Sequence, residues 1–159
     1  PEPLIFGEAT RVMSLRDGTK KMSKSDPSDY SRIMLNDNVD SIVQKIKKAK
    51  TDSFPLPSSK SEAEKRPEAL NLITIFAALN DQSTTKVLEE YAGKEFSLFK
   101  KDLADLSVEK LQPISNEIIK LMNDQNYLDN IMKTGKDKAI TIAESVLKQV
   151  YEIVGFSNI

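Results

Sequence analysis

Apolar residues recur at helical spacing along almost the whole chain after residue 38, and this pattern limits the possible folds more than any other feature. An amphipathic helix places apolar residues at positions i, i+3, i+4 and i+7, whereas a half-buried strand alternates at every second residue. The stretches that follow the helical spacing are 39–49, 70–79, 84–92, 99–121, 127–134 and 139–154. The sequence therefore predicts a mainly α-helical chain whose apolar stripes form a core.

Two positions have residues suited to begin a helix. The side chain of Asn36 or Asp37 can cap the helix at 39–49, and Ser83 can cap the short helix that follows it. One side of the helix at 39–49 is polar, and we interpret it as a solvent-exposed face. The residues on that side are Gln44, Lys45, Lys47 and Lys48.

Other residues are suited to end or interrupt helices. Gly93, Gly135 and Gly155 stand where helices are expected to stop, because glycine tolerates the left-handed conformation at a helix end. Pro113 lies inside the stripe at 99–121, and a proline within a helix removes a backbone hydrogen bond. We therefore expect this helix to kink or to be two helices.

Little regular structure is expected outside these helices. A loose alternation over 10–15 predicts a short strand, and 32–35 is a second possible strand. The segment 16–29 is expected to be a loop in which Gly18 permits unusual backbone angles. The segment 51–67 contains three prolines and four serines, so it is expected to be a long exposed connection.

The distribution of charge is more informative than the net charge of −1. Residues 11–50 hold ten basic and five acidic side chains, whereas residues 51–159 hold 13 basic and 17 acidic ones. This local excess favours an anionic ligand near one end of the chain, although a pI of 5.7 is too low to indicate nucleic acid by itself. With neither cysteine nor histidine, the chain has no disulfides and lacks the commonest metal ligands. No apolar run approaches the length of a membrane span, so we expect a cytoplasmic protein without membrane contact.

The pentapeptide Lys21-Met22-Ser23-Lys24-Ser25 lies within this basic region and is the strongest candidate for chemistry. Two lysines three residues apart place mobile ammonium groups over one short patch, which suits a polyphosphate. Hydroxyls and successive backbone amides can also donate to phosphate oxygens. A solvent-exposed turn rich in lysine and serine would explain the same residues, so the pentapeptide alone leaves both interpretations open.

The pentapeptide KMSKS is one of the two signatures of class I aminoacyl-tRNA synthetases, and its surroundings resemble the tryptophanyl-tRNA synthetase family. The resemblance covers essentially the whole chain, apart from a poor match over 54–67, Gly18 in place of an expected proline, and residues 8–10, which differ from the usual small residues before the strand. The stretches that carry it are RVMSLRDGTKKMSKSDP, VDSIVQKIKKAKTDS, LNLITIFAAL, YAGKEFSLFKKDLA and VEKLQPI.

For the fold, the resemblance implies two parts. Residues 1–35 would be the end of a Rossmann-type catalytic domain with the KMSKS loop, and residues 36–159 a bundle-like helical domain that binds the tRNA anticodon. The other class signature contains histidine, and in the family it lies with the tryptophan pocket in the preceding half. The chain, which starts at Pro1 without a methionine, is therefore expected to be a carboxy-terminal part that is inactive alone.

For the function, the resemblance implies activation of tryptophan by ATP to tryptophanyl-AMP, followed by transfer to tRNA(Trp). Lys21 and Lys24 would contact the ATP phosphates, with Lys24 favoured for the departing pyrophosphate. Met22 would offer backbone contacts to adenine, while Ser23 and Ser25 would shape the loop or donate to phosphate. Mg²⁺ would arrive on the nucleotide without a protein ligand, and the complete enzyme is expected to be a homodimer.

Two alternatives remain at this point. The first is the tyrosyl-tRNA synthetase, the nearest relative, although that enzyme usually continues into a further small RNA-binding domain. The second is a helical tRNA-binding module derived from a synthetase and without catalytic activity. The intact lysine pair favours retained nucleotide binding over this second alternative.

Overall fold

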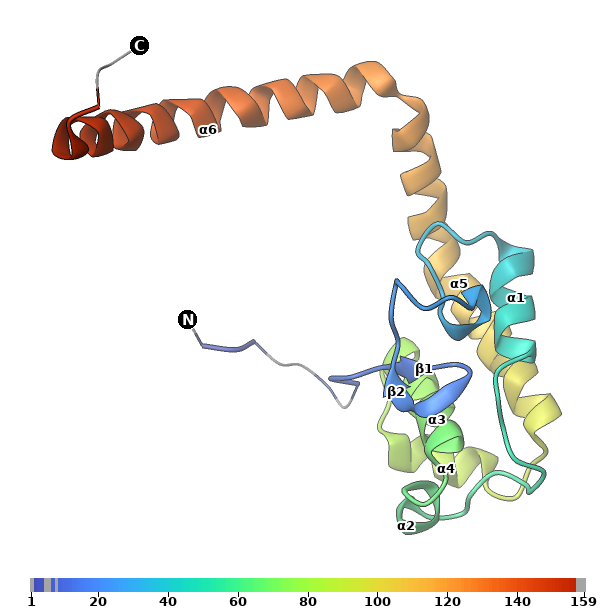
Figure 1. Cartoon of the computed structure of the whole chain (residues 1–159). Helices are drawn as coiled ribbons and strands as arrows, with labels where there is room; N and C mark the ends of the chain where they lie inside the picture. Colours follow the sequence, from blue (N-terminus) through green and yellow to red (C-terminus); the bar gives the residue numbers. More distant parts are fainter. Residues whose placement is uncertain (1, 5–6, 8, 157–159) are drawn as a thin grey trace. The chain divides into compact units, whose positions relative to one another are not determined.

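The computed structural model describes residues 2–4, 7 and 9–156, and these are mainly α-helical, as predicted (Figure 1). The elements are β1 (Met13–Ser14), β2 (Asp17–Lys21), the short 3₁₀ helix η1 (Asp29–Ser31), α1 (Val39–Lys47), α2 (Lys60–Ala63), α3 (Pro67–Leu79), α4 (Thr84–Tyr91), α5 (Phe96–Asn123) and α6 (Gln125–Val154). The chain divides into two compact units, residues 1–116 and 117–159, with the division inside α5.

The two strands form an antiparallel hairpin, which corrects part of the sequence prediction. The second strand is β2, within the segment predicted to be a loop, and the stretch 32–35 forms no strand. The chain turns at Leu15 and Arg16, where the hydroxyl of Ser14 accepts a hydrogen bond from the backbone amide of Arg16 at 3.1 Å. At the start of β2, the carboxylate of Asp17 accepts from the backbone amide and hydroxyl of Thr19 at 3.1 and 2.6 Å. The hairpin is continued past β2 by a backbone hydrogen bond of 3.1 Å from Met22 to Val12.

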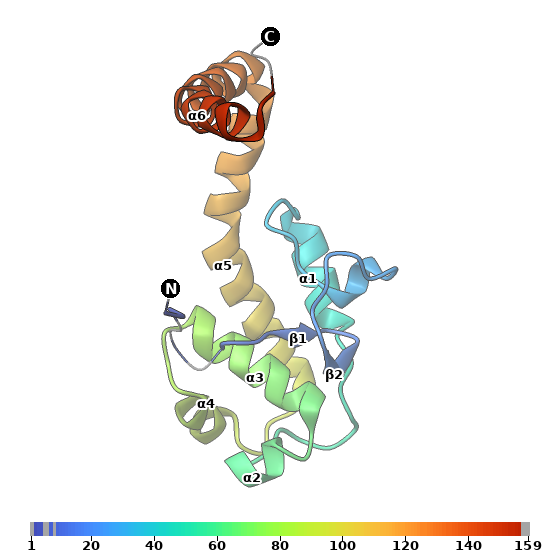
Figure 2. The ribbon, with the colours of Figure 1, turned by 60° about the vertical axis from the view of Figure 1, so that its left-hand side comes forward.

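The hairpin lies against α3, as Figures 1 and 2 both show. Asn71 of α3 is buried, and its side-chain amide forms hydrogen bonds with the backbone of β1, as a neighbouring strand would. Its oxygen accepts from the backbone amide of Met13 at 2.9 Å, and its nitrogen donates to the carbonyl of the same residue at 2.9 Å. These paired bonds fix β1 onto a helix of the core, and β1 pairs with β2, the strand that leads into the pentapeptide.

Gly18 is needed for a close approach rather than for an unusual backbone angle. Its φ is not positive, but a Cβ at this position would lie 2.4 Å from the carbonyl carbon of Pro67 and 2.5 Å from the amide nitrogen of Glu68. Both of those atoms belong to the backbone at the start of α3 and cannot rotate away. The residue at 18 therefore determines how closely the hairpin packs on the helix.

We expect Gly18→Ala to lower the free energy of unfolding by about 1–3 kcal/mol, because the added methyl group forces the hairpin away from α3. Urea unfolding followed by circular dichroism measures the change. Gly135→Ala is the matched control, since Gly135 lies within α6 and a Cβ there meets no atom within 4 Å. That control should gain stability by up to about 1 kcal/mol. Equal stability of Gly18→Ala and wild type would contradict the close approach.

The core of the first unit is formed by α1, α3, α4 and the first half of α5. Its centre is an aromatic cluster in which the ring centroids of Phe76, Tyr91 and Phe99 lie 4.9–5.4 Å apart. The aliphatic side chains that are almost fully buried around it are Ile42, Ile46, Leu72, Ile73, Val87 and Leu103. The predicted apolar stripes of α1, α3, α4 and the first half of α5 therefore form the core, whereas the stripe does not stay buried in the second half of α5, where Ile114 is 46% exposed.

The observed helix ends agree only partly with the prediction. Ser83 caps α4 by accepting from the amide of Lys86, whereas α1 is capped by Asn38 instead of Asn36 or Asp37. Gly93 follows α4 and Gly155 follows α6, both with positive φ, as predicted. The cap of α1 moves because Asp37 uses its carboxylate to accept from the amide of Met34.

The predicted end of a helix at Gly135 does not occur, and of the two alternatives predicted at Pro113, a kink or two helices, the second is wrong. α5 is one helix of 28 residues that contains Pro113, and α6 is one helix of 30 residues that continues through Gly135. A single glycine costs a helix only about 1 kcal/mol, which the neighbouring turns can offset. None of the side chains described in α6 is buried, so the stripe at 139–154 does not form a core within the second unit.

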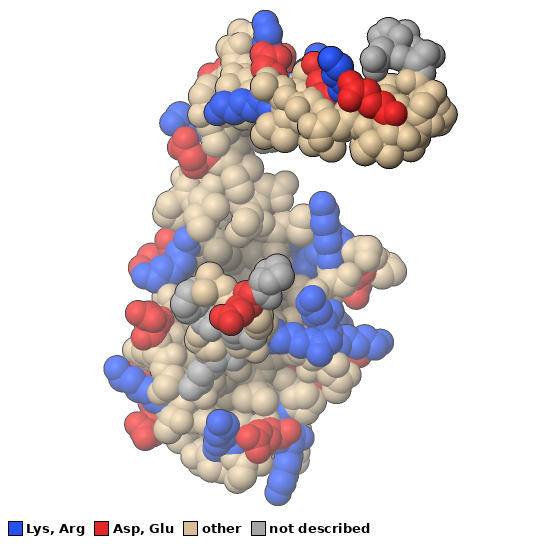
Figure 3. All heavy atoms as spheres, turned by 90° about the vertical axis from the view of Figure 1, so that its left-hand side faces the viewer, with Lys and Arg blue, Asp and Glu red and all other residues tan. Residues whose placement is uncertain are grey.

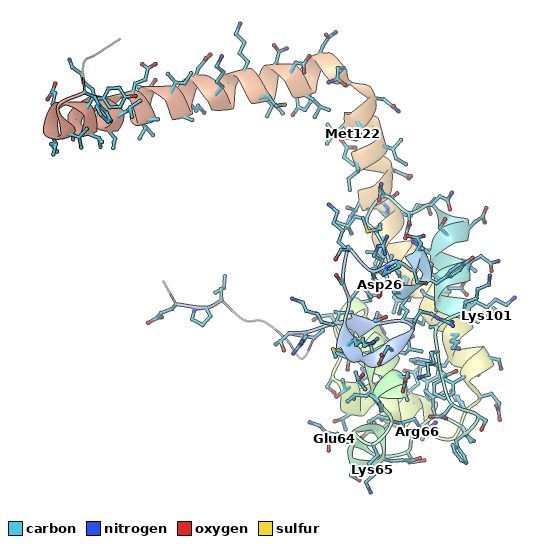
Figure 4. The ribbon with its side chains drawn as sticks, in the orientation of Figure 1. Asp26, Glu64, Lys65, Arg66, Lys101 and Met122 are labelled. Carbon is cyan, nitrogen blue, oxygen red and sulfur yellow. The ribbon has the colours of Figure 1, made fainter. Side chains whose placement is uncertain are left out.

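The segment 51–67 is more ordered than a long exposed connection. It contains α2, and Leu56, Pro57 and Ala63 are buried. Arg66, labelled in Figure 4, holds the segment together through two hydrogen bonds of 2.8 and 2.6 Å to the carboxylate of Asp52. Proline excludes long helices here, but it leaves the segment free to pack as a folded loop.

Candidate nucleotide-binding loop

The pentapeptide lies where the chain leaves β2, and its first half is anchored. Lys21 is the last residue of β2, and its side chain is exposed. Met22 is half-buried, packs against the core and donates its backbone amide to Val12. The hairpin therefore fixes the entry to the loop while leaving the ammonium group of Lys21 in solvent.

Residues 23–25 form an exposed turn. The hydroxyls of Ser23 and Ser25 lie 3.1 Å apart, and the hydroxyl of Ser23 also accepts from the backbone amide of Ser25 at 3.3 Å. The amide of Asp26 donates to the carbonyl of Ser23 at 3.4 Å. The serines thus shape the turn, and Lys24 projects from it with an exposed side chain.

The two lysines of the pentapeptide are available to a ligand. Within residues 9–156, the structure gives neither Lys21 nor Lys24 a hydrogen bond or an ion pair with its side chain. The neighbouring Lys20 differs, because its ammonium group lies 3.4 Å from the carboxylate of Asp17. In the view of Figure 3, several Lys and Arg side chains gather at the right-hand edge of the first unit, and others are scattered over its left edge and base. An exposed ammonium group without an internal partner attracts anions, and within residues 9–156 this holds for both Lys21 and Lys24.

The exit from the loop is held by Arg32. Its guanidinium group donates to the carbonyl of Asp26 at 2.9 Å and lies 3.3 Å from the carboxylate of Asp29. The hydroxyl of Ser31 donates to the carbonyl of Ser28 at 2.7 Å. Asp26, labelled in Figure 4, therefore marks the point where the chain becomes fixed again.

Lys45 corrects the prediction of a solvent-exposed polar face on α1. Its side chain is only 3% exposed, and its ammonium group lies 2.6 Å from the carboxylate of Asp37 and 2.8 Å from that of Asp29. Burial alone would lower the pKa of Lys45, but the hydrogen bonds to both carboxylates outweigh it and raise this pKa. The hydrogen bond from Lys45 in turn lowers the pKa of Asp29.

The sequence did contain a signal for this buried lysine. Lys45 follows Ile42 by three residues and directly precedes Ile46, so it falls inside the apolar stripe of α1. A lysine in such a stripe is almost never buried unless a carboxylate pairs with it. Asp37, eight residues earlier, is that partner.

Together these contacts make a short arch that is fixed at Met22 and again at Asp26. The turn between them carries the ammonium group of Lys24, two hydroxyls and successive backbone amides, and the ammonium group of Lys21 lies just before Met22 at the end of β2. These are the kinds of group that bind phosphate oxygens. Among the described residues, no group of three or more acidic side chains is placed to hold a metal ion.

Comparison with known proteins decides the family. Residues 1–112 match the protein family described as tRNA synthetases class I (W and Y). The chain belongs to this family. Tryptophan--tRNA ligases of Rhizobium meliloti and Agrobacterium fabrum are 55% and 54% identical to it over 155 residues, or 98% of the chain. The same alignments cover only 44% of each relative, so the chain spans less than half of their length.

Solved structures of the family share the fold. The tryptophanyl-tRNA synthetase of Mycoplasma pneumoniae is 29% identical, with a TM-score of 0.67 over 94% of this chain and 46% of its own. That of Campylobacter jejuni, solved as a complex with ADP and tryptophan, is 25% identical, with a TM-score of 0.73 over 98% of this chain and 46% of its own. No helix among the described residues is long and apolar enough to cross a membrane.

Proposed function

We propose that the complete protein is a tryptophan--tRNA ligase and that this chain supplies its phosphate-binding loop. The ligase activates tryptophan with ATP to tryptophanyl-AMP and then transfers the tryptophanyl group to tRNA(Trp). The observation that carries the proposal is a pair of exposed lysines without a partner among the described residues, with Lys21 at the end of β2 and Lys24 on the turn that is fixed at Met22 and Asp26. The identity of 55% to a tryptophan--tRNA ligase supports the choice of amino acid.

The chemistry needs positioning and charge stabilisation rather than a general base. The tryptophan carboxylate is already ionised when it attacks the α-phosphorus of ATP, and pyrophosphate leaves. Lys21 contacts the phosphates, and Lys24 follows the departing pyrophosphate as negative charge develops on it. Ser23 and Ser25 keep the turn in shape and can donate to phosphate. The amide of Met22 is already used in the hairpin, so its carbonyl is the group left to accept from the adenine amine.

The remaining assignments belong to the same proposal. Residues 1–35 complete a Rossmann-type catalytic domain, and residues 36–159 form the helical domain that meets the tRNA anticodon. The complete enzyme is a homodimer in the cytoplasm. Mg²⁺ reaches the site bound to ATP. Together with the two lysines, it neutralises the negative charge of the phosphates.

We expect the complete protein to catalyse ATP–pyrophosphate exchange that depends on tryptophan, whereas residues 1–159 alone should show none. The second expectation follows because the tryptophan pocket and the histidine-containing signature lie outside this sequence in the proposed enzyme. Exchange of labelled pyrophosphate into ATP measures both. Tyrosine in place of tryptophan is the control, and exchange with tyrosine alone would favour the tyrosyl-tRNA synthetase. No exchange with either amino acid would favour a non-catalytic tRNA-binding module.

A further inference from the structure

Beyond the pentapeptide, a cluster of charged residues links the exit of the loop to α1. Lys45 projects from α1 and binds two carboxylates from different segments, Asp37 before the helix and Asp29 in η1. Asp29 in turn lies 3.3 Å from the guanidinium group of Arg32, which donates to the carbonyl of Asp26 at the end of the turn. A continuous path of short polar contacts therefore joins a buried lysine to the backbone beside Lys24.

The two carboxylates that bind Lys45 differ in their surroundings. The side chain of Asp37 is 14% exposed, and that of Asp29 is 64% exposed. Asp37 supplies a close counter-ion for the buried ammonium, so the core does not require the second carboxylate. Asp29, which water could solvate well, nevertheless points back to Lys45 at 2.8 Å. The contact with Asp29 therefore acts mainly on the segment that carries Asp29.

We propose that Lys45 is a positioning residue, which acts through Asp29 and Arg32 to set the place of Lys24 over the ATP phosphates. The inference rests on the proposed function, because it concerns the rate of adenylate formation. Asp26 is only two residues beyond Lys24, so a shift of its carbonyl is passed almost directly to the lysine backbone. Displacing a charge-stabilising group by about 1 Å can cost up to roughly 10²-fold in rate.

Asp29→Ala tests the proposal in the complete protein without opening the core, because the Asp29 side chain is mostly exposed. We expect the single-turnover rate of tryptophanyl-AMP formation to fall roughly 10-fold at saturating ATP and tryptophan, with the KM for tryptophan unchanged. The matched control is Asp40→Ala. Asp40 is exposed on α1 and lines the same surface pocket of about 240 Å³ as Asp29 and Lys45. The Asp40→Ala variant removes the same charge from a nearby position, and its rate of tryptophanyl-AMP formation should stay within about twofold of wild type.

A double variant separates positioning from a general structural effect. If Asp29 acts through Lys24, adding Asp29→Ala to Lys24→Ala should slow the reaction by less than about twofold further. A full 10-fold loss in that background, or a rate within twofold of wild type for Asp29→Ala alone, overturns the proposal. Wild-type protein that forms no tryptophanyl-AMP would instead refute the proposed function. These two failures are distinguished by the wild-type measurement alone.

Discussion

Lys24→Ala in the complete protein should slow the formation of tryptophanyl-AMP by about 10²–10³-fold at saturating tryptophan. Charge moves onto the departing pyrophosphate as the transition state forms. An ammonium group that reaches this charge at that moment stabilises the transition state more than bound ATP, so its loss lowers kcat rather than only raising KM. Lys24 is suited to this role because it is exposed and has no internal partner within the described turn.

Pre-steady-state measurement of tryptophanyl-AMP, with ATP varied, distinguishes the two lysines. For Lys21→Ala, weaker ATP binding should account for a larger part of the loss than it does for Lys24→Ala. The reason is that Lys21 is anchored at the end of β2 and can already contact phosphate in bound ATP. Lys24→Arg should recover only part of the rate, since a planar guanidinium group replaces a compact charge poorly.

Lys20→Ala is the matched control for both lysines. It removes the same charge from β2, but Lys20 pairs with Asp17 and its side chain points to the opposite face of the strand from Lys21. Its rate should stay close to wild type. A rate near wild type for Lys24→Ala would show that the pentapeptide has no part in the reaction.

The sequence predicted those elements whose cause is local. The helices α1, α3, α4 and α5 follow from apolar spacing, and Ser83 and Gly155 mark helix ends through their own backbone preferences. Gly135 shows the limit of such rules, because a residue that can end a helix does not have to end it. The end of α4 just before Gly93 and the strand β1 were likewise predictable from residues close in sequence.

Features that depend on distant contacts were not predicted. β2 was missed because its five residues contain no apolar alternation, and the strand is supported instead by the pairing of its backbone with β1 and by packing on α3. Gly18 was interpreted through its backbone freedom, whereas the start of α3, almost 50 residues later, explains it. In the candidate site, the pentapeptide was visible in the sequence, but the residues that hold its exit, Asp29, Arg32 and Lys45, come together only in the fold.

Lys45→Met should lower the free energy of unfolding by about 3–5 kcal/mol, the largest change in stability that we expect from one substitution of a charged residue in this chain. Methionine fills a similar volume, so the loss comes from electrostatics rather than from a cavity. Without the ammonium group, the carboxylate of Asp37 stays mostly buried with the amide of Met34 as a remaining hydrogen-bond donor at 2.8 Å. Urea unfolding measures the change, and Lys47→Met, on the exposed side of α1, should stay within about 0.5 kcal/mol of wild type.

A second substitution tests whether the uncompensated charge is the cause. Asp37→Asn removes the negative charge but keeps an oxygen that can accept from Met34, so the double variant Lys45→Met/Asp37→Asn should be more stable than Lys45→Met by at least about 1 kcal/mol. Asp37→Asn alone should instead destabilise the chain, because it weakens the pair with Lys45. Additive losses in the double variant would mean that the uncompensated charge of Asp37 is not the cause of the loss in Lys45→Met. Recovery of stability in the double variant would show that the ammonium group of Lys45 stabilises the fold by compensating the charge of its carboxylate partners. One of these partners, Asp29, lies in the segment that fixes the phosphate-binding loop.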